Sequence, residues 1–343
     1  MNYLHTIFGI LLLAVAMTGI TACSSDDDDT NFSTPQYESV SAYYEVTSHN
    51  SDIKSVELTS SGNYIVIRDN ASSRQAYFFS RFVIAPDEDE TRATTYQNII
   101  KGRFTKISDT EFELEGFGRI VITGNADNAL SLEITPENGQ TYTLTAAKKT
   151  QNPDSQKTSW LCRTWNISGF AMKIEMTKGG NTVTVIDGKY SMDDEQRLKQ
   201  DIVAGLKTLF QTFFPEEYER DREGADATAE NAVKDINITG ENSPLQIIFT
   251  KAGTYMVLYK GEKLAVATWA WDDEEKGILR YSWDYSNMGK DKGSWSTKYG
   301  TAEVSFSSHQ LVLKEEGNSD VLSEYVGDFS VYKSISWLLE EEQ

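Results

Sequence analysis

The chain has 343 residues and a formal net charge of −20, with 24% charged and 11% aromatic residues. This composition is typical of a globular protein with one large or two ordinary domains, and it excludes a disordered chain. The acidic balance argues against nucleic acid as a partner, because affinity for nucleic acid depends largely on Lys and Arg that neutralise phosphates.

Residues 1–22 have the proportions of an export signal. The apolar run Ile7–Ala16 is shorter than the roughly 20 residues that a membrane-spanning helix needs. The tetrad Ile20-Thr21-Ala22-Cys23 follows it and resembles the lipobox of bacterial lipoproteins. This resemblance implies that Cys23 becomes the diacylated N-terminal residue, with palmitate as an expected acyl group, and that the chain is held to a membrane through this lipid.

Residues 23–38 are predicted to form an acidic tether. The run Ser24–Asp29 is similar to the acidic export tag of Bacteroidetes surface lipoproteins. The similarity implies an outer-membrane protein on the cell surface. An ordinary acidic spacer on a protein that faces the periplasm is the alternative.

Residues 39–147 alternate apolar and polar side chains between turn signals, which predicts an all-β meander module. Ile65–Ile67 follows the turn Ser61-Gly62-Asn63. Asn138-Gly139 lies between two apolar runs and predicts a hairpin with a type I′ turn, in which both central residues have positive φ.

Residues 148–158 contain no large apolar side chain and are predicted to be a linker. The second domain, residues 159–343, is expected to begin with a strand from Leu161 to Ile167. An insertion at about 191–235 contains an amphipathic helix with Ser191 as its N-cap and Pro215 at its end. The apolar face of this helix consists of Leu198, Ile202, Leu206, Leu209 and Phe213. A second helix is expected in 216–235, and strands resume at Leu245 and continue to Tyr332.

Two short segments of the halves are alike. Leu58–Ile67 matches Phe249–Leu258 in its apolar, Thr, Gly, Tyr and Val positions, and Ile107–Leu114 has a weaker counterpart in Phe306–Leu313. A duplicated meander and independent convergence of hairpins with Gly turns both explain the likeness.

The segment Trp160–Trp165 resembles the first strand of lipocalin-like domains in Bacteroidetes lipoproteins. The run Phe249–Tyr255 is similar to the second signature of that family, and Gly293-Ser294-Trp295 and Leu311-Val312-Leu313 are similar to its later strands. The resemblance implies an antiparallel β-barrel over about 160–333 that holds a small apolar ligand. It assigns no ligand residue.

Residues with catalytic or metal-binding chemistry are sparse. The mature chain has two histidines, His49 and His309, and no nucleophile elbow, phosphate loop or dinucleotide fingerprint accompanies them. His309 is expected to lie in a solvated turn. Cys162 is expected to be a buried, inert thiol. We therefore expect no catalytic site, no metal site and no cofactor.

The strongest candidate site is aromatic. Trp269 and Trp271 share one face of a predicted strand, and Tyr281, Trp283 and Tyr285 share a face of the next. If the turn Asp272–Gly277 joins the strands as a hairpin, these five rings form one surface. The surface either packs the barrel core, lines a ligand cavity or forms an exposed platform, and Thr, Ala and Ser on the other face favour an inward aromatic side.

The sequence thus predicts a mainly β, non-enzymatic, lipid-anchored envelope protein that binds a small apolar or amphipathic ligand in a barrel. The alternative is a surface glycan-binding or adhesion accessory protein that uses exposed aromatic rings.

Overall fold

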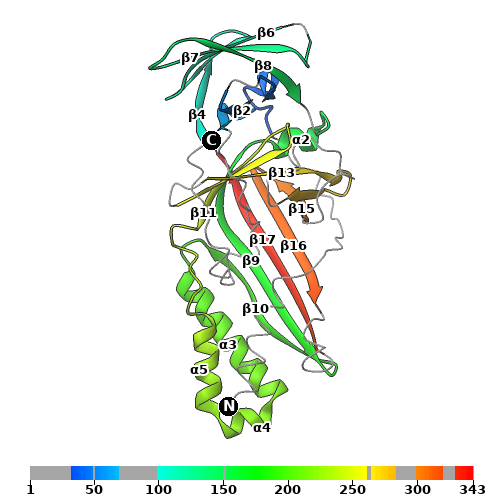
Figure 1. Cartoon of the computed structure of the whole chain (residues 1–343). Coiled ribbons are helices and arrows are strands. Elements are labelled where there is room, and N and C mark those ends of the chain that lie inside the picture. Colours follow the sequence, from blue (N-terminus) through cyan, green and yellow to red (C-terminus); the bar gives the residue numbers. More distant parts are fainter. Residues whose placement is uncertain are drawn as a thin grey trace.

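The protein is mainly β with few helices, as predicted, and it contains two eight-stranded antiparallel barrels (Figure 1). The structure, a computed structural model, describes residues 32–48, 51–68, 99–124, 126–149, 152–260, 264–282, 299–319 and 329–342. The first barrel lies at one end of the molecule, and the helices of residues 195–232 lie beside the far end of the second barrel.

The first barrel is a simple meander in which each strand pairs with the next and the last returns to the first. A short 3-10 helix, η1 (Glu38–Val40), precedes it. Its strands are β1 (Ala42–Val46), β2 (Ile53–Leu58), β3 (Asn63–Arg68), β4 (Ile99–Lys106), β5 (Glu111–Leu114), β6 (Gly118–Thr123), β7 (Leu130–Pro136) and β8 (Tyr142–Lys149). Apolar side chains at alternate positions, including Val56, Phe112 and Leu132, fill the interior.

The hairpin predicted at Asn138-Gly139 joins β7 to β8, with Ile134 opposite Tyr142. The predicted turn type is wrong, because neither Asn138 nor Gly139 has a positive φ. The connection spans residues 137–141, and a loop of that length reverses the chain without the mirror-image turn that a two-residue loop requires.

The second barrel begins with a helix rather than with the predicted linker and strand. The polar stretch 148–158 contains the end of β8 and the start of α2 (Gln156–Leu161). The side chain of Ser155 caps α2 by accepting the backbone N–H of Thr158. The first strand therefore starts at Thr164, three residues later than predicted.

The strands of the second barrel again form a meander, closed by pairing of β17 with β9. They are β9 (Thr164–Lys178), β11 (Pro244–Phe249), β12 (Thr254–Tyr259), β13 (Leu264–Asp273), β14 (Ile278–Ser282), β15 (Tyr299–Ser307), β16 (Gln310–Ser319) and β17 (Phe329–Glu341), and a ninth strand, β10 (Asn181–Ser191), pairs with β9 outside this ring. β11 pairs only with the first residues of β9, whereas β10 pairs with residues 169–178. β10 therefore extends the sheet away from the first barrel (Figure 1).

Three helices cover this extension: α3 (Glu195–Phe213), α4 (Pro215–Arg220) and α5 (Arg222–Ala232). The predicted apolar face of α3 is confirmed, since Leu198, Leu206, Leu209 and Phe213 are buried. The predicted cap is wrong: α3 begins at Glu195, and the Asp194 carboxylate instead accepts the backbone N–H of Ser191.

The first pair of similar segments forms equivalent turns in the two barrels. Gly62 and Gly253 both have positive φ, of 83° and 88°. In each turn a threonine hydroxyl accepts a backbone N–H four residues later, Thr59 from Asn63 and Thr250 from Thr254. The second pair is not equivalent, because Ile107–Leu114 spans the hairpin between the fourth and fifth strands of its barrel, whereas Phe306–Leu313 spans the hairpin between the sixth and seventh strands of the other.

The two equivalent hairpins form much of the contact between the barrels. Ile65 and Ile67 on the outside of the first barrel pack with Ile248, Met256 and Val266 on the outside of the second. The contact is therefore an apolar layer between the outer faces of both sheets.

Candidate ligand-binding site in the second barrel

The aromatic hairpin predicted from the sequence is formed by β13 and β14, with Trp269 opposite Tyr281. Trp269, Trp271 and Tyr281 belong to the interior core of the second barrel and are 0%, 8% and 3% exposed. These three rings therefore share the inward face, as the alternation predicts. Trp283 and Tyr285 lie outside the described residues, as does Cys23.

Trp269 and Trp271 fill the end of the barrel that α2 covers. Their rings meet edge to face, with centroids 5.6 Å apart, and Phe249 lies 5.8 Å from Trp269. The indole N–H of Trp269 donates to the carbonyl of Thr250 at 3.0 Å, and that of Trp271 to the Thr158 hydroxyl at 2.8 Å. Both side chains are packed and hydrogen-bonded, so at this end of the barrel they act as core residues.

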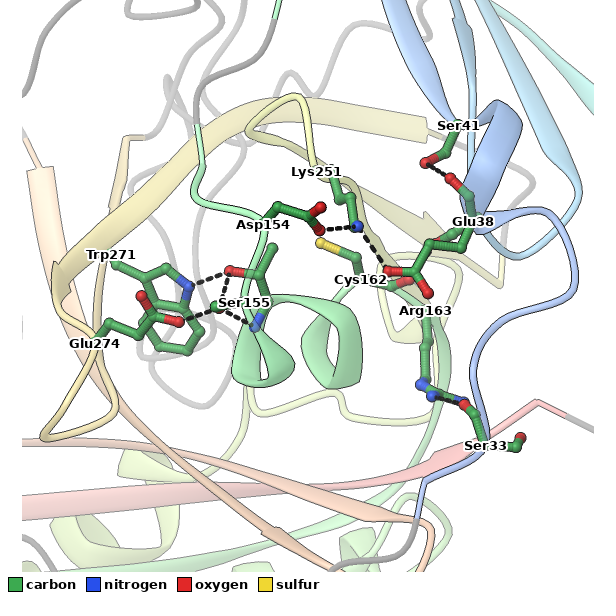
Figure 2. A network of polar contacts seen from close by, with 12 residues as sticks. Ser33, Glu38, Ser41, Asp154, Ser155, Cys162, Arg163, Lys251, Trp271 and Glu274 are labelled. Carbon is green, nitrogen blue, oxygen red and sulfur yellow. Dashed lines mark hydrogen bonds and ion pairs between the residues drawn. The ribbon is translucent and has the colours of Figure 1, made fainter.

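Helix α2 is held over this end by polar contacts (Figure 2). The Ser155 hydroxyl donates to the Glu274 carboxylate in the β13–β14 turn, and Lys157 donates to the carbonyls of Glu274 and Glu275. Lys251, which follows β11, forms ion pairs with Asp154 and with Glu38 of η1. These contacts close the end of the second barrel and tie the N-terminal segment to it.

The N-terminal segment adds a ring to the same closed end. Phe32 is buried, with its centroid 5.8 Å from those of Trp160, Trp165 and Phe306. The guanidinium of Arg163 lies 5.0 Å from the centre of the Phe32 ring.

The same guanidinium holds the backbone of this segment. Arg163 donates to the Ser33 carbonyl (Figure 2) and also pairs with the Glu341 carboxylate. The prediction of a tether over residues 23–38 is therefore wrong for residues 32–38, which are part of the folded structure because Phe32 is buried and Arg163 holds the backbone of Ser33.

The opposite half of the barrel interior contains a carboxyl group that the sequence analysis did not single out. Glu315 lies on the inward face of β16, alternating with buried Leu311, Leu313 and Gly317. It is 7% exposed, and its Oε2 accepts a 2.8 Å hydrogen bond from the Tyr281 hydroxyl. Among the described residues, no partner reaches its Oε1. Burial raises the pKa of Glu315 to about 7.

Small residues occupy some of the inward positions near Glu315, and one of them is covered by the Tyr281 ring. Gly300 lies opposite Tyr281 in the β14–β15 pair, and a Cβ on it would be 2.3 Å from the Tyr281 ring. Ala302 and Gly317 also occupy inward positions. Glu315 also has larger neighbours, because Ile335 lies opposite it on β17, Trp337 is a diagonal neighbour on the same strand, and the Tyr281 hydroxyl donates to it.

A signal for Glu315 was present in the sequence. In Leu311-Val312-Leu313-Lys314-Glu315, the alternation that makes both leucines inward also makes the glutamate inward. A charged residue in the apolar phase of a strand marks a candidate site, because burying an unpaired carboxylate is costly.

The other chemistry-bearing residues lie as expected where the structure describes them. His309 is exposed in the β15–β16 turn with a φ of 67°, and its Nδ1 is 2.9 Å from Glu341 Oε2. Cys162 is buried, and burial raises the pKa of its thiol well above the usual range. His49 lies outside the described residues. The described ranges contain no cluster of His, Cys, Asp and Glu suited to a metal ion.

Comparison of the chain with protein-family models, with curated proteins and with solved structures gives no match. Within the described parts of the chain, no helix combines the length and apolar character needed to cross a membrane.

Proposed function

We propose that the protein is a non-enzymatic, lipid-anchored carrier of the bacterial cell envelope that binds a small apolar or amphipathic molecule inside its second, lipocalin-like barrel. The lipid is attached at Cys23, and the protein is displayed at the outer membrane, on the cell surface.

The observation that carries the binding function is the Glu315 carboxyl group inside the barrel. A folded protein pays a large free-energy cost for a buried polar atom without a partner, so such atoms are rare and need an explanation. Glu315 Oε1 is one of them among the described residues, and it lies on the inner face of the second barrel, where Oε2 of the same carboxyl group accepts from Tyr281. A bound molecule with a polar end supplies the missing hydrogen bond.

The proposed location in the cell envelope is supported by the predicted export signal of residues 1–22, by the lipobox-like tetrad Ile20–Cys23 and by the position of Phe32. Residues 24–31 separate Cys23 from this buried ring. At about 3.3–3.6 Å per extended residue, they keep the closed end of the second barrel within about 30 Å of the anchor.

An exposed aromatic platform for glycans is less well supported. Trp269 and Trp271 are buried and packed against other rings, so they present no open face to a sugar.

The binding function is tested with the chain from Ser24 onward, which keeps every described residue. Displacement of the neutral fluorescent probe N-phenyl-1-naphthylamine reports occupancy of an apolar interior. Gly317→Leu places a bulky side chain inside the barrel, and we expect it to abolish probe binding. Asn318→Leu, one residue along on the exposed face, is the matched control and should bind normally. Failure of the unaltered chain to bind the probe or any native lipid extract contradicts the proposal.

A further inference from the structure

Three polar side chains from three strands meet in the same half of the second barrel. Tyr281 comes from β14, Glu315 from β16 and Lys333 from β17. Tyr281 donates to Glu315, and the charge of Lys333 acts on the Glu315 carboxyl. Glu315 pairs with Ile335 and Gly317 with Lys333, so Lys333 is the diagonal cross-strand neighbour of Glu315. Such neighbours on one face lie about 7–8 Å apart.

The two charged groups place opposite demands on the head group of a ligand. A carboxylate head is repelled by ionised Glu315, and an ammonium head is repelled by Lys333. Both effects are strengthened by burial, because charges interact more strongly away from water. A neutral hydrogen-bonding head avoids both penalties.

A hydroxyl group fits both protonation states of Glu315. Oε2 already accepts from Tyr281, so the proton of a neutral carboxyl lies on Oε1 and needs an acceptor. In the ionised state, Oε1 needs a donor. A hydroxyl oxygen supplies either function at one atom, whereas an ammonium can only donate and a carboxylate can only accept.

We propose, on the basis of the function proposed above, that the ligand of the second barrel is an apolar molecule with a neutral hydroxyl head, and that this hydroxyl hydrogen-bonds to Glu315 Oε1.

The outer face of the same strand offers a matched control. The next residue, Glu316, faces away from the interior and likewise accepts a hydrogen bond from a tyrosine, Tyr332, at 2.9 Å. It also forms an ion pair with Lys314 at 2.8 Å. Changing Glu316 removes a tyrosine-bonded carboxylate from the same strand without altering the interior.

The test compares 1-dodecanol, dodecylamine and dodecanoic acid, which share one alkyl chain and differ in the head. Their affinities are measured by displacement of N-phenyl-1-naphthylamine at pH 6 and pH 8, with the chain from Ser24 onward. We expect dodecanol to bind most tightly at both pH values. Glu315→Leu should weaken dodecanol binding about tenfold, the effect of one lost buried hydrogen bond. Glu316→Leu should change it less than about twofold.

A second substitution keeps the proposal testable if Glu315→Leu does not fold. Glu315→Gln retains a donor and an acceptor but removes the charge, so it should keep dodecanol binding. It should also improve dodecanoic acid binding at pH 8 about tenfold. Among the described residues, Tyr281, Tyr255 and Lys333 are the other titratable side chains that act on this region, and all three are unchanged in this comparison.

The outcomes separate the two proposals. If none of the three probes binds, the carrier function itself fails. If all bind but the amine or the acid binds most tightly, or if neither Glu315 substitution changes the preference among heads, the hydroxyl proposal is overturned while the carrier function stands.

Discussion

The carboxyl group of Glu57 is buried between the two barrels and should make their contact weaken as pH rises. Glu57 lies on the outer face of β2, 3% exposed. Its Oε2 accepts a 2.6 Å hydrogen bond from the hydroxyl of Thr254, and Thr250 lies 2.5 Å from Thr254 through their hydroxyls. Burial raises the pKa of Glu57 from 4.5 to about 7, although the threonine hydroxyls oppose the rise.

The direction of the pH effect follows from proton binding. Between pH 4.5 and 7 the folded protein holds a proton on Glu57 that the unfolded chain has released. The stabilising contribution of this proton is therefore complete at low pH and is lost as pH rises through 7. One pKa unit corresponds to about 1.4 kcal/mol, so relative to low pH the raised pKa of Glu57 lowers the free energy of unfolding by about 1 kcal/mol at pH 5 and about 3 kcal/mol at pH 8.

Glu57→Gln removes this cost, because a neutral amide oxygen still accepts from Thr254. The substitution should raise the free energy of unfolding relative to the unaltered chain by about 2–3 kcal/mol more at pH 8 than at pH 5. Urea unfolding followed by tryptophan fluorescence at both pH values measures this difference. The titration of all other groups cancels between the two proteins.

Glu113→Gln, at an exposed position on β5, is the matched control and should change the same difference by less than about 0.5 kcal/mol. A Glu57→Gln protein whose stability gain is equal at pH 5 and pH 8 would refute the reasoning, because the carboxyl would then not titrate between the barrels.

Four further substitutions or reactions test other parts of the structure. Gly205→Ala should destabilise the protein by about 1–3 kcal/mol in urea unfolding, because the new Cβ would lie 1.7 Å from the Val185 carbonyl oxygen. Ala normally stabilises a helix relative to Gly, so a gain in stability would contradict this packing of α3 on β10. Phe32→Ala should cost about 3 kcal/mol and expose the N-terminal segment to limited proteolysis, whereas unchanged cleavage shows that the ring is not docked. In the chain from Ser24 onward, the Cys162 thiol should react with a disulfide reagent about 100-fold more slowly than in urea, and equal rates contradict its burial. Cys23→Ser should abolish incorporation of labelled palmitate and release the protein from the membrane fraction, and retention of the label would move the anchor elsewhere.

Local patterns predicted much of the fold because they depend on neighbours along the chain. A period of two assigns side chains to the two faces of a strand, so the shared face of Trp269, Trp271 and Tyr281 could be read directly. The spacing of apolar residues in α3 defined its buried face in the same way. The helix α2 was missed because its first turn is polar and its stability depends on contacts with the β13–β14 turn.

By itself, the sequence determined the β class, the main helix, the inward face of the aromatic hairpin and the likeness of the Gly62 and Gly253 turns. Only the tertiary structure decided that these turns bring the barrels together, that the tryptophans fill the closed end, and that Glu315 lies opposite Tyr281 in the other half. The reason is that the alternation of apolar and polar residues tells which face of a strand a residue lies on, but not its height along the barrel axis. That height depends on the registers of several successive strand pairs and on the tilt of the strands, and all of these are fixed only once the barrel has closed.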